Sequence, residues 1–225
     1  MRQFAVIVAG GSGSRMNTEI PKQYLPVSGL PVLMHSINAF HNYSQDVEII
    51  VVLPPKDLKL WEELCKKYEF NLSVQITSGG DTRFQSVKNG LDRIESDGIV
   101  AIHDGVRPLV NKEIIAASYE IAALHGSAIA AVRLKESIRV TDKDQTKTVD
   151  RSKYRIIQTP QTFQVSLIKK AYEIAENPQF TDDASVLEKS GYKISLFEGS
   201  YKNIKITTPE DMIIAEAFLK NREPN

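Results

Sequence analysis

Two cationic side chains, Arg15 and Lys22, closely follow a glycine-rich segment near the start of the chain. Glycines without side chains let backbone N–H groups approach a ligand and form a concavity that binds anions. Arg15 and Lys22 add two full positive charges to this loop, and a turn needs neither of them. The combination predicts a site for several phosphates at the end of the first strand, where Gly10, Gly11 and Gly13 leave the backbone open.

The spacing of this loop excludes two common phosphate-binding motifs. A Walker A loop needs a Gly-Lys-Ser/Thr ending, which the segment lacks. A dinucleotide fingerprint needs a third glycine where Met16 stands, and it needs an acidic residue about 20 residues later at a strand end. The sequence has neither. The simpler interpretation, an ordinary turn between a strand and a helix, is not excluded.

A second polar cluster, His103-Asp104-Gly105-Val106-Arg107-Pro108, follows another apolar run. Asp104 could bind hydroxyl groups or a metal ion, and Arg107 could face an anion. The simpler interpretation is a local pair of Asp104 and Arg107 that fixes the loop. A lone histidine beside a strand is more often structural, so His103 is not included among the catalytic candidates.

A second glycine turn, Gly79-Gly80, leads into a segment with helical periodicity. Backbone groups of this turn, together with the hydroxyl of Ser86, could read the edge of a nucleobase. Capping of the following helix by Asp81 or Thr82 is about equally well supported.

Three further polar residues carry weaker signals. Thr181 precedes two aspartates, a pattern typical of a helix N-terminus. Lys205 alternates with apolar residues and either extends to solvent or points into a site; the pattern alone favours solvent. Arg151 lies in a polar stretch where a solvated charge is the default.

Apolar runs and helical periodicities alternate from residue 4 to residue 132, which predicts a doubly wound, mostly parallel α/β sheet of Rossmann-like type with helices on both faces. Ligands of such sheets bind at the carboxyl ends of the strands, where the three polar clusters fall. The predicted strands are 4–9, 48–53, 73–77, 99–102 and 128–132, and the predicted helices are 31–40, 56–69, 84–91 and 112–125.

Residues 133–157 interrupt this alternation with a polar, highly charged stretch that alternates like a hairpin around a turn at 142–145. A two-stranded arm is marginal alone, so we expect it to pack on a second subunit. One domain is expected over residues 1–225, with the arm as its projection. Beyond the arm the patterns predict helices at 165–177, 183–190 and 209–220 and strands at 193–197 and 203–206.

The composition limits the possible partners. Lys and Arg number 28 and Asp and Glu number 28, so no overall charge attracts nucleic acid or membranes. The sole cysteine, Cys65, excludes an intrachain disulfide, and neither a secretion signal nor an apolar stretch of membrane-spanning length is evident. We therefore expect a cytoplasmic protein that binds neither nucleic acid nor membranes.

Taken together, the motifs resemble one enzyme family along essentially the whole chain. The motifs come in a fixed order. First are the glycine loop with Arg15, the Pro21-Lys22-Gln23-Tyr24 segment and the Gly79-Gly80 turn. Then follow HDGVRP at 103–108, QTPQTF at 158–163, TDDAS at 181–185 and NIKITTPED at 203–211. This order is similar to that of the 2-C-methyl-D-erythritol 4-phosphate cytidylyltransferase family of non-mevalonate isoprenoid biosynthesis.

The resemblance implies an enzyme that joins CTP and methylerythritol 4-phosphate, releases pyrophosphate, uses Mg²⁺ or a similar divalent cation and forms a homodimer. Catalysis would depend on Arg15, Lys22, Lys205 and Arg151. CTP would be bound by Ala9, Gly10, Gly11, Gly13, Gly80, Asp81 and Ser86. The polyol phosphate would be bound by Asp104, Arg107, Ser137, Arg151, Thr159 and Thr181, with Ser137 and Arg151 reaching across the dimer. Family members often have Thr where Ser137 stands. No protein ligand for the metal is implied with certainty, because CTP phosphates would hold most of it.

Other functions stay open from the sequence. Ribitol 5-phosphate cytidylyltransferases share the glycine loop, the lysine and the HD..RP segment, and both substrates are phosphorylated polyols. The TRFQSV and NIKITTPED segments favour methylerythritol phosphate. A dinucleotide-dependent oxidoreductase would lack its third glycine and its acidic residue, and a non-catalytic nucleotide-binding module would not need Arg15, Lys22 and Lys205 together.

Overall fold

A seven-stranded sheet forms the centre of the computed structural model, which describes residues 1–10, 20–142 and 145–221. Every neighbouring pair is parallel except the pairs made by β10, which runs antiparallel to both of its neighbours. The predicted fold class, a mostly parallel α/β sheet, is confirmed. In spatial order the strands are β11 (Leu196–Glu198), β7 (Ser127–Arg133), β10 (Arg155–Gln164), β6 (Ile99–Asp104), β1 (Gln3–Val8), β4 (Glu48–Leu53) and β5 (Gln75–Ser78).

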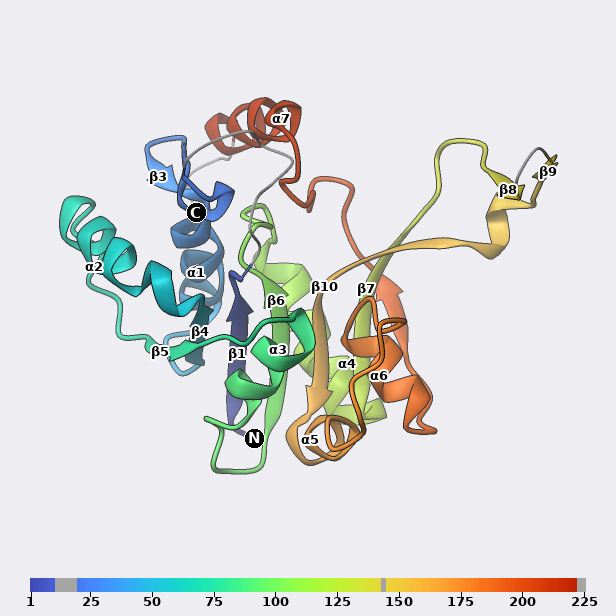
Figure 1. The fold of residues 1–225 in the computed structure, drawn as a ribbon, viewed down its shortest axis with the longest axis horizontal. Coiled ribbons are helices and arrows are strands. Elements are labelled where there is room, and N and C mark those ends of the chain that lie inside the picture. The colour runs from blue at the N-terminus through green and yellow to red at the C-terminus, as the bar shows by residue number, and fades with distance from the viewer. Residues whose placement is uncertain (11–19, 143–144, 222–225) are drawn as a thin grey trace.

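Helices cover both faces of this sheet because each strand sends alternate side chains to opposite sides. Phe4, Val6 and Val8 pack on the face that carries α3 (Arg83–Leu91), α5 (Val165–Ala171) and α6 (Asp183–Lys189), which lie in front of the strands in Figure 1. Ala5 and Ile7 pack on the opposite face with α1 (Val32–Tyr43), α2 (Leu58–Lys67) and α4 (Lys112–His125). Burial on both faces explains why the strands read as continuous apolar runs.

Cap residues set the limits of the best-predicted helices. Asn111 accepts a hydrogen bond from the backbone N–H of Ile114 at the start of α4, and Gly126 ends the helix with φ of 85°. Thr208 and Asp211 form a capping box at the start of α7 (Pro209–Lys220). None of the helices within the described ranges combines the length and apolar character needed to cross a bilayer.

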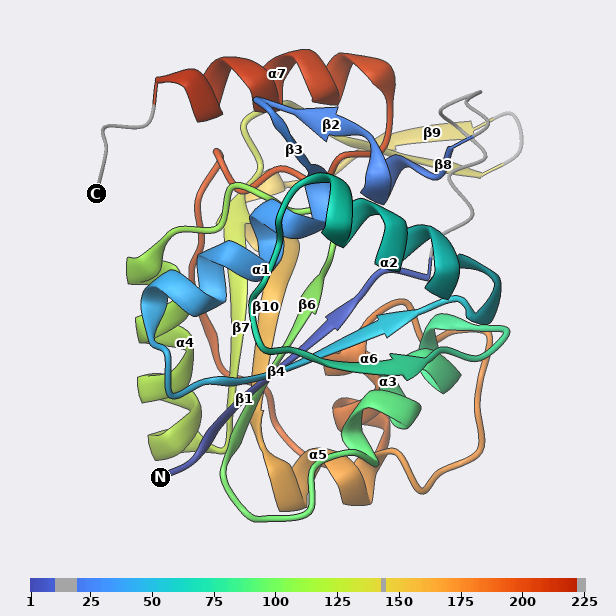
Figure 2. The same ribbon diagram turned by 90° about the vertical axis from the view of Figure 1, so that its left-hand side faces the viewer.

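A third, smaller layer lies over one end of the sheet. Helix α7 packs on the short antiparallel pair β2 (Pro26–Val27) and β3 (Leu30–Pro31), and both views place them at the same end of the strands. Figure 2 shows α7 lying across the top of the molecule. The apolar centre of this layer includes Val27, Val32, Ile206 and Ala215.

The structure departs from the sequence prediction at several elements, and the strand predicted at 193–197 is observed as β11 (Leu196–Glu198). The sequence pattern missed β10, and the helix predicted at 165–177 ends at Ala171. Residues 203–206, predicted as a strand, form a loop. In place of a strand ladder, the Ile206 N–H donates to the Val106 carbonyl, and the Asn203 carbonyl accepts from the Arg107 and Gln158 side chains.

The predicted arm is present as a hairpin of β8 (Arg139–Asp142) and β9 (Gln145–Thr148). All eight residues of these strands are exposed. Strands β7 and β10 still pair at Arg133 and Arg155, so the segment that leaves the sheet is shorter than the predicted 133–157. Figure 1 shows the hairpin projecting away from the rest of the molecule.

Candidate active site

The carboxyl ends of the parallel strands bring the three polar clusters of the sequence to one edge of the sheet. Val8 of β1 pairs with Asp104 of β6 and with Val52 of β4, and Leu53 pairs with Ser78 of β5. The glycine loop, the Gly79-Gly80 turn and the Asp104 cluster therefore begin side by side. This is the edge at which sheets of this type bind ligands.

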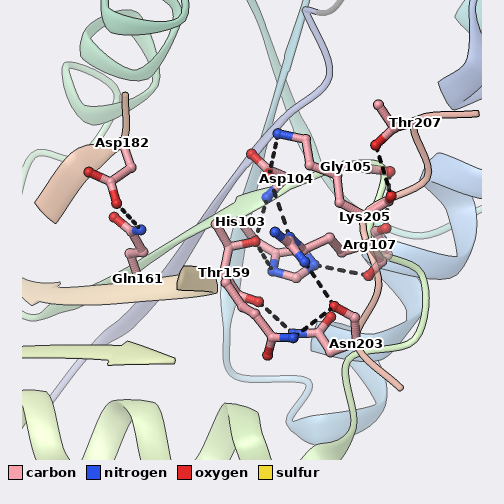
Figure 3. A network of polar contacts seen from close by, with 12 residues as sticks. His103, Asp104, Gly105, Arg107, Thr159, Gln161, Asp182, Asn203, Lys205 and Thr207 are labelled. Atoms are coloured by element: carbon pink, nitrogen blue, oxygen red, sulfur yellow. Dashed lines mark hydrogen bonds and ion pairs between the residues drawn. The ribbon is translucent and has the colours of Figure 1, made fainter. Parts of the chain in front are cut away.

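Asp104 is the centre of a charged cluster (Figure 3). Lys205 Nζ lies 2.9 Å from Asp104 Oδ2, and Arg107 Nε lies 3.5 Å from the same oxygen. Arg83 Nε lies 3.7 Å from Oδ1. The pattern left open whether Lys205 extends to solvent or points into a site; in the structure its side chain is 43% exposed and its ammonium contacts Asp104.

These cations keep Asp104 ionised although its carboxylate is nearly buried, with 11% of the side chain exposed. Burial alone would raise the pKa of Asp104, but Arg83, Lys205 and Arg107 hold that pKa well below its ordinary value. An ionised carboxylate accepts hydrogen bonds and donates none. Asp104 is therefore equipped to bind hydroxyl groups, while the cations around it attract phosphate.

His103 supports this cluster from inside the protein. Its Nε2 lies 3.1 Å from the Arg107 carbonyl oxygen and its Nδ1 lies 3.0 Å from Thr159 Oγ1. Because a carbonyl only accepts, Nε2 carries the proton and Nδ1 accepts from the Thr159 hydroxyl. Burial lowers the pKa of His103 to about 4, so the ring is neutral near pH 7. A structural role for His103 agrees with its omission from the catalytic candidates.

Thr159 and Asn203 hold the backbone around Asp104. The Thr159 hydroxyl oxygen accepts from the Asp104 backbone N–H at 3.0 Å, and the Asn203 side-chain amide donates to the Thr159 carbonyl at 2.8 Å. Thr159 lies where the register of β10 against β7 shifts. Arg107 Nη1 donates to the Asn203 carbonyl at 2.8 Å, which ties the loop carrying Lys205 to the same cluster.

Arg83 joins the cluster from the first position of α3. Its guanidinium makes two parallel hydrogen bonds to Asp183, Nη1 to Oδ1 at 2.8 Å and Nη2 to Oδ2 at 2.7 Å. Asp183 is buried and also accepts from the Tyr172 hydroxyl at 2.6 Å. Arg83 therefore links the second glycine turn to the segment that carries Thr181.

A cavity of ≈ 240 Å³ lies over this cluster. Five residues predicted from the sequence line it, namely Asp104, Arg107, Thr159, Thr181 and Lys205. Sequence reasoning assigned no binding or catalytic role to five other lining residues, namely Arg83, Ile157, Gln158, Gln161 and Asp182. An arginine at a helix N-terminus, where the helix dipole disfavours a cation, was the signal that could have identified Arg83.

The second glycine turn is closed by Ser86. Its Oγ accepts from the Gly80 N–H at 3.1 Å and donates to the Thr82 carbonyl at 2.8 Å. A Cβ at Gly79 would lie 2.7 Å from that Oγ, so this close approach requires glycine. Thr82 caps α3 by accepting from the Gln85 N–H, which confirms one of the two predicted caps, and Asp81 is exposed beside it.

Lys22 lies close to the end of β1. It is buried in a short 3₁₀ helix, η2 (Lys22–Tyr24), and the neighbouring Gln23 side chain donates to the Ala9 carbonyl at 2.9 Å. A Cβ at Gly10 would lie 3.6 Å from Ser86 Oγ, so the two glycine turns adjoin each other. The predicted site residues Gly11, Gly13 and Arg15 lie outside the described residues.

Ser137 and Arg151 lie apart from the cavity and do not line it. Both are exposed, on the segment that carries the projecting hairpin. The Arg151 guanidinium donates to the Lys135 carbonyl within the same segment. The structure thus brings five predicted residues together around Asp104 and leaves these two on the arm.

Residues 1–10, 20–142 and 145–221 contain no group of three or more His, Cys, Asp or Glu side chains that could hold a metal ion. The carboxylate nearest the centre of the site, Asp104, is already shared by three cations. The described donor set therefore does not fit a metal held by protein ligands alone.

The sheet is mostly parallel, and its carboxyl edge carries glycine turns and the nearly buried Asp104 carboxylate surrounded by cations. These features are typical of α/β enzymes that bind phosphorylated ligands. Residues 3–221 match the family model described as IspD, 2-C-methyl-D-erythritol 4-phosphate cytidylyltransferase. The chain belongs to this family, whose members are nucleotidyltransferases.

Individual relatives agree with this assignment. The chain is 47% identical over 219 residues to the 2-C-methyl-D-erythritol 4-phosphate cytidylyltransferase of Bacteroides thetaiotaomicron, covering 97% of this chain and all of the relative. The corresponding enzyme of Caldanaerobacter subterraneus is 45% identical over 226 residues, covering 98% of this chain and 100% of the relative. The crystal structure of 4-diphosphocytidyl-2C-methyl-D-erythritol synthase from Anaerococcus prevotii superposes with a TM-score of 0.83 at 31% identity, covering 97% and 96% of the two chains.

Proposed function

We propose that this protein transfers the cytidylyl group of CTP to 2-C-methyl-D-erythritol 4-phosphate, giving CDP-methylerythritol and pyrophosphate in non-mevalonate isoprenoid biosynthesis. The observation that carries the proposal is the cavity in which an ionised carboxylate, two threonines and several cations converge. A phosphorylated polyol offers both hydroxyl groups for the carboxylate and a phosphate for the cations. Family membership over residues 3–221 supports the same reaction.

The CTP half of the site is proposed at the two adjoining glycine turns. Ala9 and Gly10 lie at the end of β1, where the Ala9 N–H already donates to the Val52 carbonyl at 2.9 Å, and Lys22 lies close to them in η2. The turn of Gly80 and Asp81, held closed by Ser86, is proposed to bind the cytosine. Gly11, Gly13 and Arg15 complete the triphosphate-binding loop in this proposal.

The polyol half is proposed around Asp104. Its carboxylate accepts from hydroxyl groups of the substrate, while Arg107 and Lys205 hold it in place and face the phosphate. Thr181 is exposed at the rim of the same cavity and offers a further hydroxyl. Thr159 lines the cavity, but its hydroxyl is already shared between the Asp104 N–H and His103, so we assign it to positioning Asp104.

The proposed reaction is an in-line displacement at the α-phosphorus of CTP. A phosphate oxygen of the polyol substrate forms the new P–O bond, the bond to the β-phosphate oxygen breaks, and pyrophosphate leaves. Such transfers need two anions held together and the charge at the transferring group stabilised. We propose Lys22 at the α-phosphate, Arg15 on the pyrophosphate side and Lys205 near the reacting phosphates. Mg²⁺, carried mainly by the CTP phosphates, would neutralise charge on their oxygens.

We propose that the enzyme is a cytoplasmic homodimer joined through its arm. The β8–β9 hairpin is exposed on all sides within one chain, and a hairpin of two strands is marginally stable alone. Packing on a second subunit would bury it. Ser137 and Arg151 would then approach the polyol phosphate in the partner's cavity.

Pyrophosphate release tests the proposal directly. The protein is mixed with CTP and either methylerythritol 4-phosphate or ribitol 5-phosphate, each with and without Mg²⁺. We expect release with methylerythritol 4-phosphate in the presence of Mg²⁺ and little release with ribitol 5-phosphate. Faster turnover of ribitol 5-phosphate would establish the alternative activity, which the family assignment does not favour.

A further inference from the structure

Arg83 lies between the two halves of the site. It follows directly after the proposed cytosine turn, at the first position of α3, and its side chain is 31% exposed at the cavity wall. A cation is disfavoured at this end of a helix because the helix dipole is positive there. The position therefore calls for carboxylates that offset the charge, and the structure provides two.

Each edge of the Arg83 guanidinium faces one of these carboxylates. The two Nη atoms bind Asp183, the first residue of α6, at 2.8 and 2.7 Å. The Nε lies 3.7 Å from Asp104 Oδ1, the carboxylate oxygen opposite the one that faces Arg107 and Lys205. Burial would lower the pKa of Arg83, but Asp183 and Asp104 raise that pKa well above its ordinary value.

The partner of Arg83 is itself rigidly held. Asp183 is buried, and its Oδ1 also accepts from the Tyr172 hydroxyl at 2.6 Å. On the preceding residue, the Asp182 carboxylate accepts from the Gln161 side chain at 2.9 Å, as Figure 3 shows. The start of α6 therefore gives Arg83 a fixed anchor, and a planar, bidentate contact fixes the orientation of a guanidinium as well as its position.

We propose that Arg83 is a positioning residue for the polyol phosphate: anchored on Asp183, it holds Asp104 and the Thr181 segment in the arrangement that binds the substrate hydroxyl groups. This inference rests on the proposed function. It assigns Arg83 no contact with the reacting phosphorus. Its loss should therefore weaken polyol phosphate binding much more than CTP binding.

The test measures KM for each substrate and kcat in Arg83→Gln, with Arg2→Gln as the matched control. Arg2 also pairs with a carboxylate, that of Glu48, but near the opposite end of the sheet. We expect KM for methylerythritol 4-phosphate to rise roughly tenfold in Arg83→Gln, with KM for CTP changing less than about twofold, since misplaced binding groups penalise the substrate they hold. Arg2→Gln should change neither constant.

A second variant tests whether Arg83 positions Asp104 or only neutralises the buried charge of Asp183. Arg83→Gln leaves a buried carboxylate unpaired and could unfold the protein, whereas the double variant Arg83→Gln/Asp183→Asn removes both charges and keeps an amide pair. Thermal unfolding should show a folded double variant, and its KM for the polyol phosphate should stay raised because Asp104 still lacks the Arg83 contact. A double variant with normal KM would overturn the inference, as would equal increases in both KM values. Absence of pyrophosphate release by the wild-type protein would instead overturn the proposed function.

Discussion

The carboxyl edge of the sheet and the projecting arm both carry charged residues, but they use them in opposite ways. At the carboxyl edge, Asp104 and Asp183 are buried and each meets a guanidinium within 4 Å. On the arm, Arg139 and Arg151 are exposed, and among the described residues their partners belong to the arm itself. One chain therefore pairs the buried carboxylates of its own cavity with cations, whereas it leaves the arm without a surface to pack on.

The difference shows where a second subunit would matter. Buried, mutually bonded charges cannot move without leaving a partner unpaired, so they hold a fixed arrangement. Exposed charges are solvated and contribute little until another surface removes their water. The contrast predicts that substitutions at the carboxyl edge act within one chain and that substitutions on the arm act between chains.

Lys22→Ala should produce the largest effect, because Lys22 is the residue proposed to act at the α-phosphate of CTP. We expect kcat to fall by about a hundredfold or more, the scale of one lost transition-state donor. Steady-state pyrophosphate release measures this. The matched control, Lys56→Ala on a short turn of the fold, should be close to wild type. Near-normal turnover in Lys22→Ala would remove Lys22 from the catalytic role.

His103 predicts a pH dependence of stability that the arm does not share. Its pKa is about 4 in the folded protein against 6.5 ordinarily, so the unfolded chain binds more protons between these values and stability rises with pH across that window. The contribution is complete above pH 6.5 and is lost as pH falls through 4. From the shift we expect a loss of about 3 kcal/mol from this group.

Chemical denaturation at pH 7, 5.5 and 4 measures this dependence. His103→Gln should be less stable than wild type at pH 7 but should lose less stability on acidification. Asp150→Asn on the arm is the control, because Asp150 is exposed and its lowered pKa reflects hydrogen bonds from Ser152 alone. Parallel pH profiles for wild type and His103→Gln would contradict the assignment.

The sequence predicted the elements that local patterns determine and missed those that depend on distant residues. Strand 48–53 and helices 112–125 and 209–220 match β4, α4 and α7, because apolar periodicity and cap residues act locally. Strand β10 was missed because its buried residues include Gln158, Thr159, Gln161 and Thr162, which no apolar pattern reveals.

The same limit applies to the candidate site. Asp104 and Arg107 stand out because they come at the end of an apolar strand, and the cavity that they line lies at the carboxyl edge of the sheet, where the sequence predicts the site. The contribution of Arg83 depends on Asp183, a hundred positions further along the chain. The strand predicted at 203–206 failed for a related reason: side chains of Arg107 and Gln158, both distant in sequence, bind the Asn203 carbonyl.

Arg151→Ala should have a smaller effect on activity, and we expect it to act on the cavity of the neighbouring subunit. We expect KM for the polyol phosphate to rise roughly tenfold, with KM for CTP little changed, as for loss of one charge-assisted contact to a phosphate. The decisive sample is a purified heterodimer of one Lys22→Ala chain and one Arg151→Ala chain. One of its two cavities then has its own Lys22 and the partner's Arg151.

If the arm serves the neighbouring cavity, this heterodimer should show the wild-type KM and about half of the wild-type kcat, because one intact site of two remains. If Arg151 serves its own chain, each cavity carries one defect and KM stays raised. The second result would place Arg151 with the carboxyl edge and remove the contrast between the two regions.

Arg139→Ala should have the smallest effect and tests whether the arm supports the fold of a single chain. Arg139 donates to the hydroxyls of Thr146 and Thr148 across the exposed hairpin. Because exposed contacts of this kind contribute little, we expect the free energy of unfolding to change by less than about 0.5 kcal/mol. Denaturation at low protein concentration measures this. A loss above about 1 kcal/mol would mean that the hairpin stabilises its own chain, and the arm would then need no partner to explain its presence.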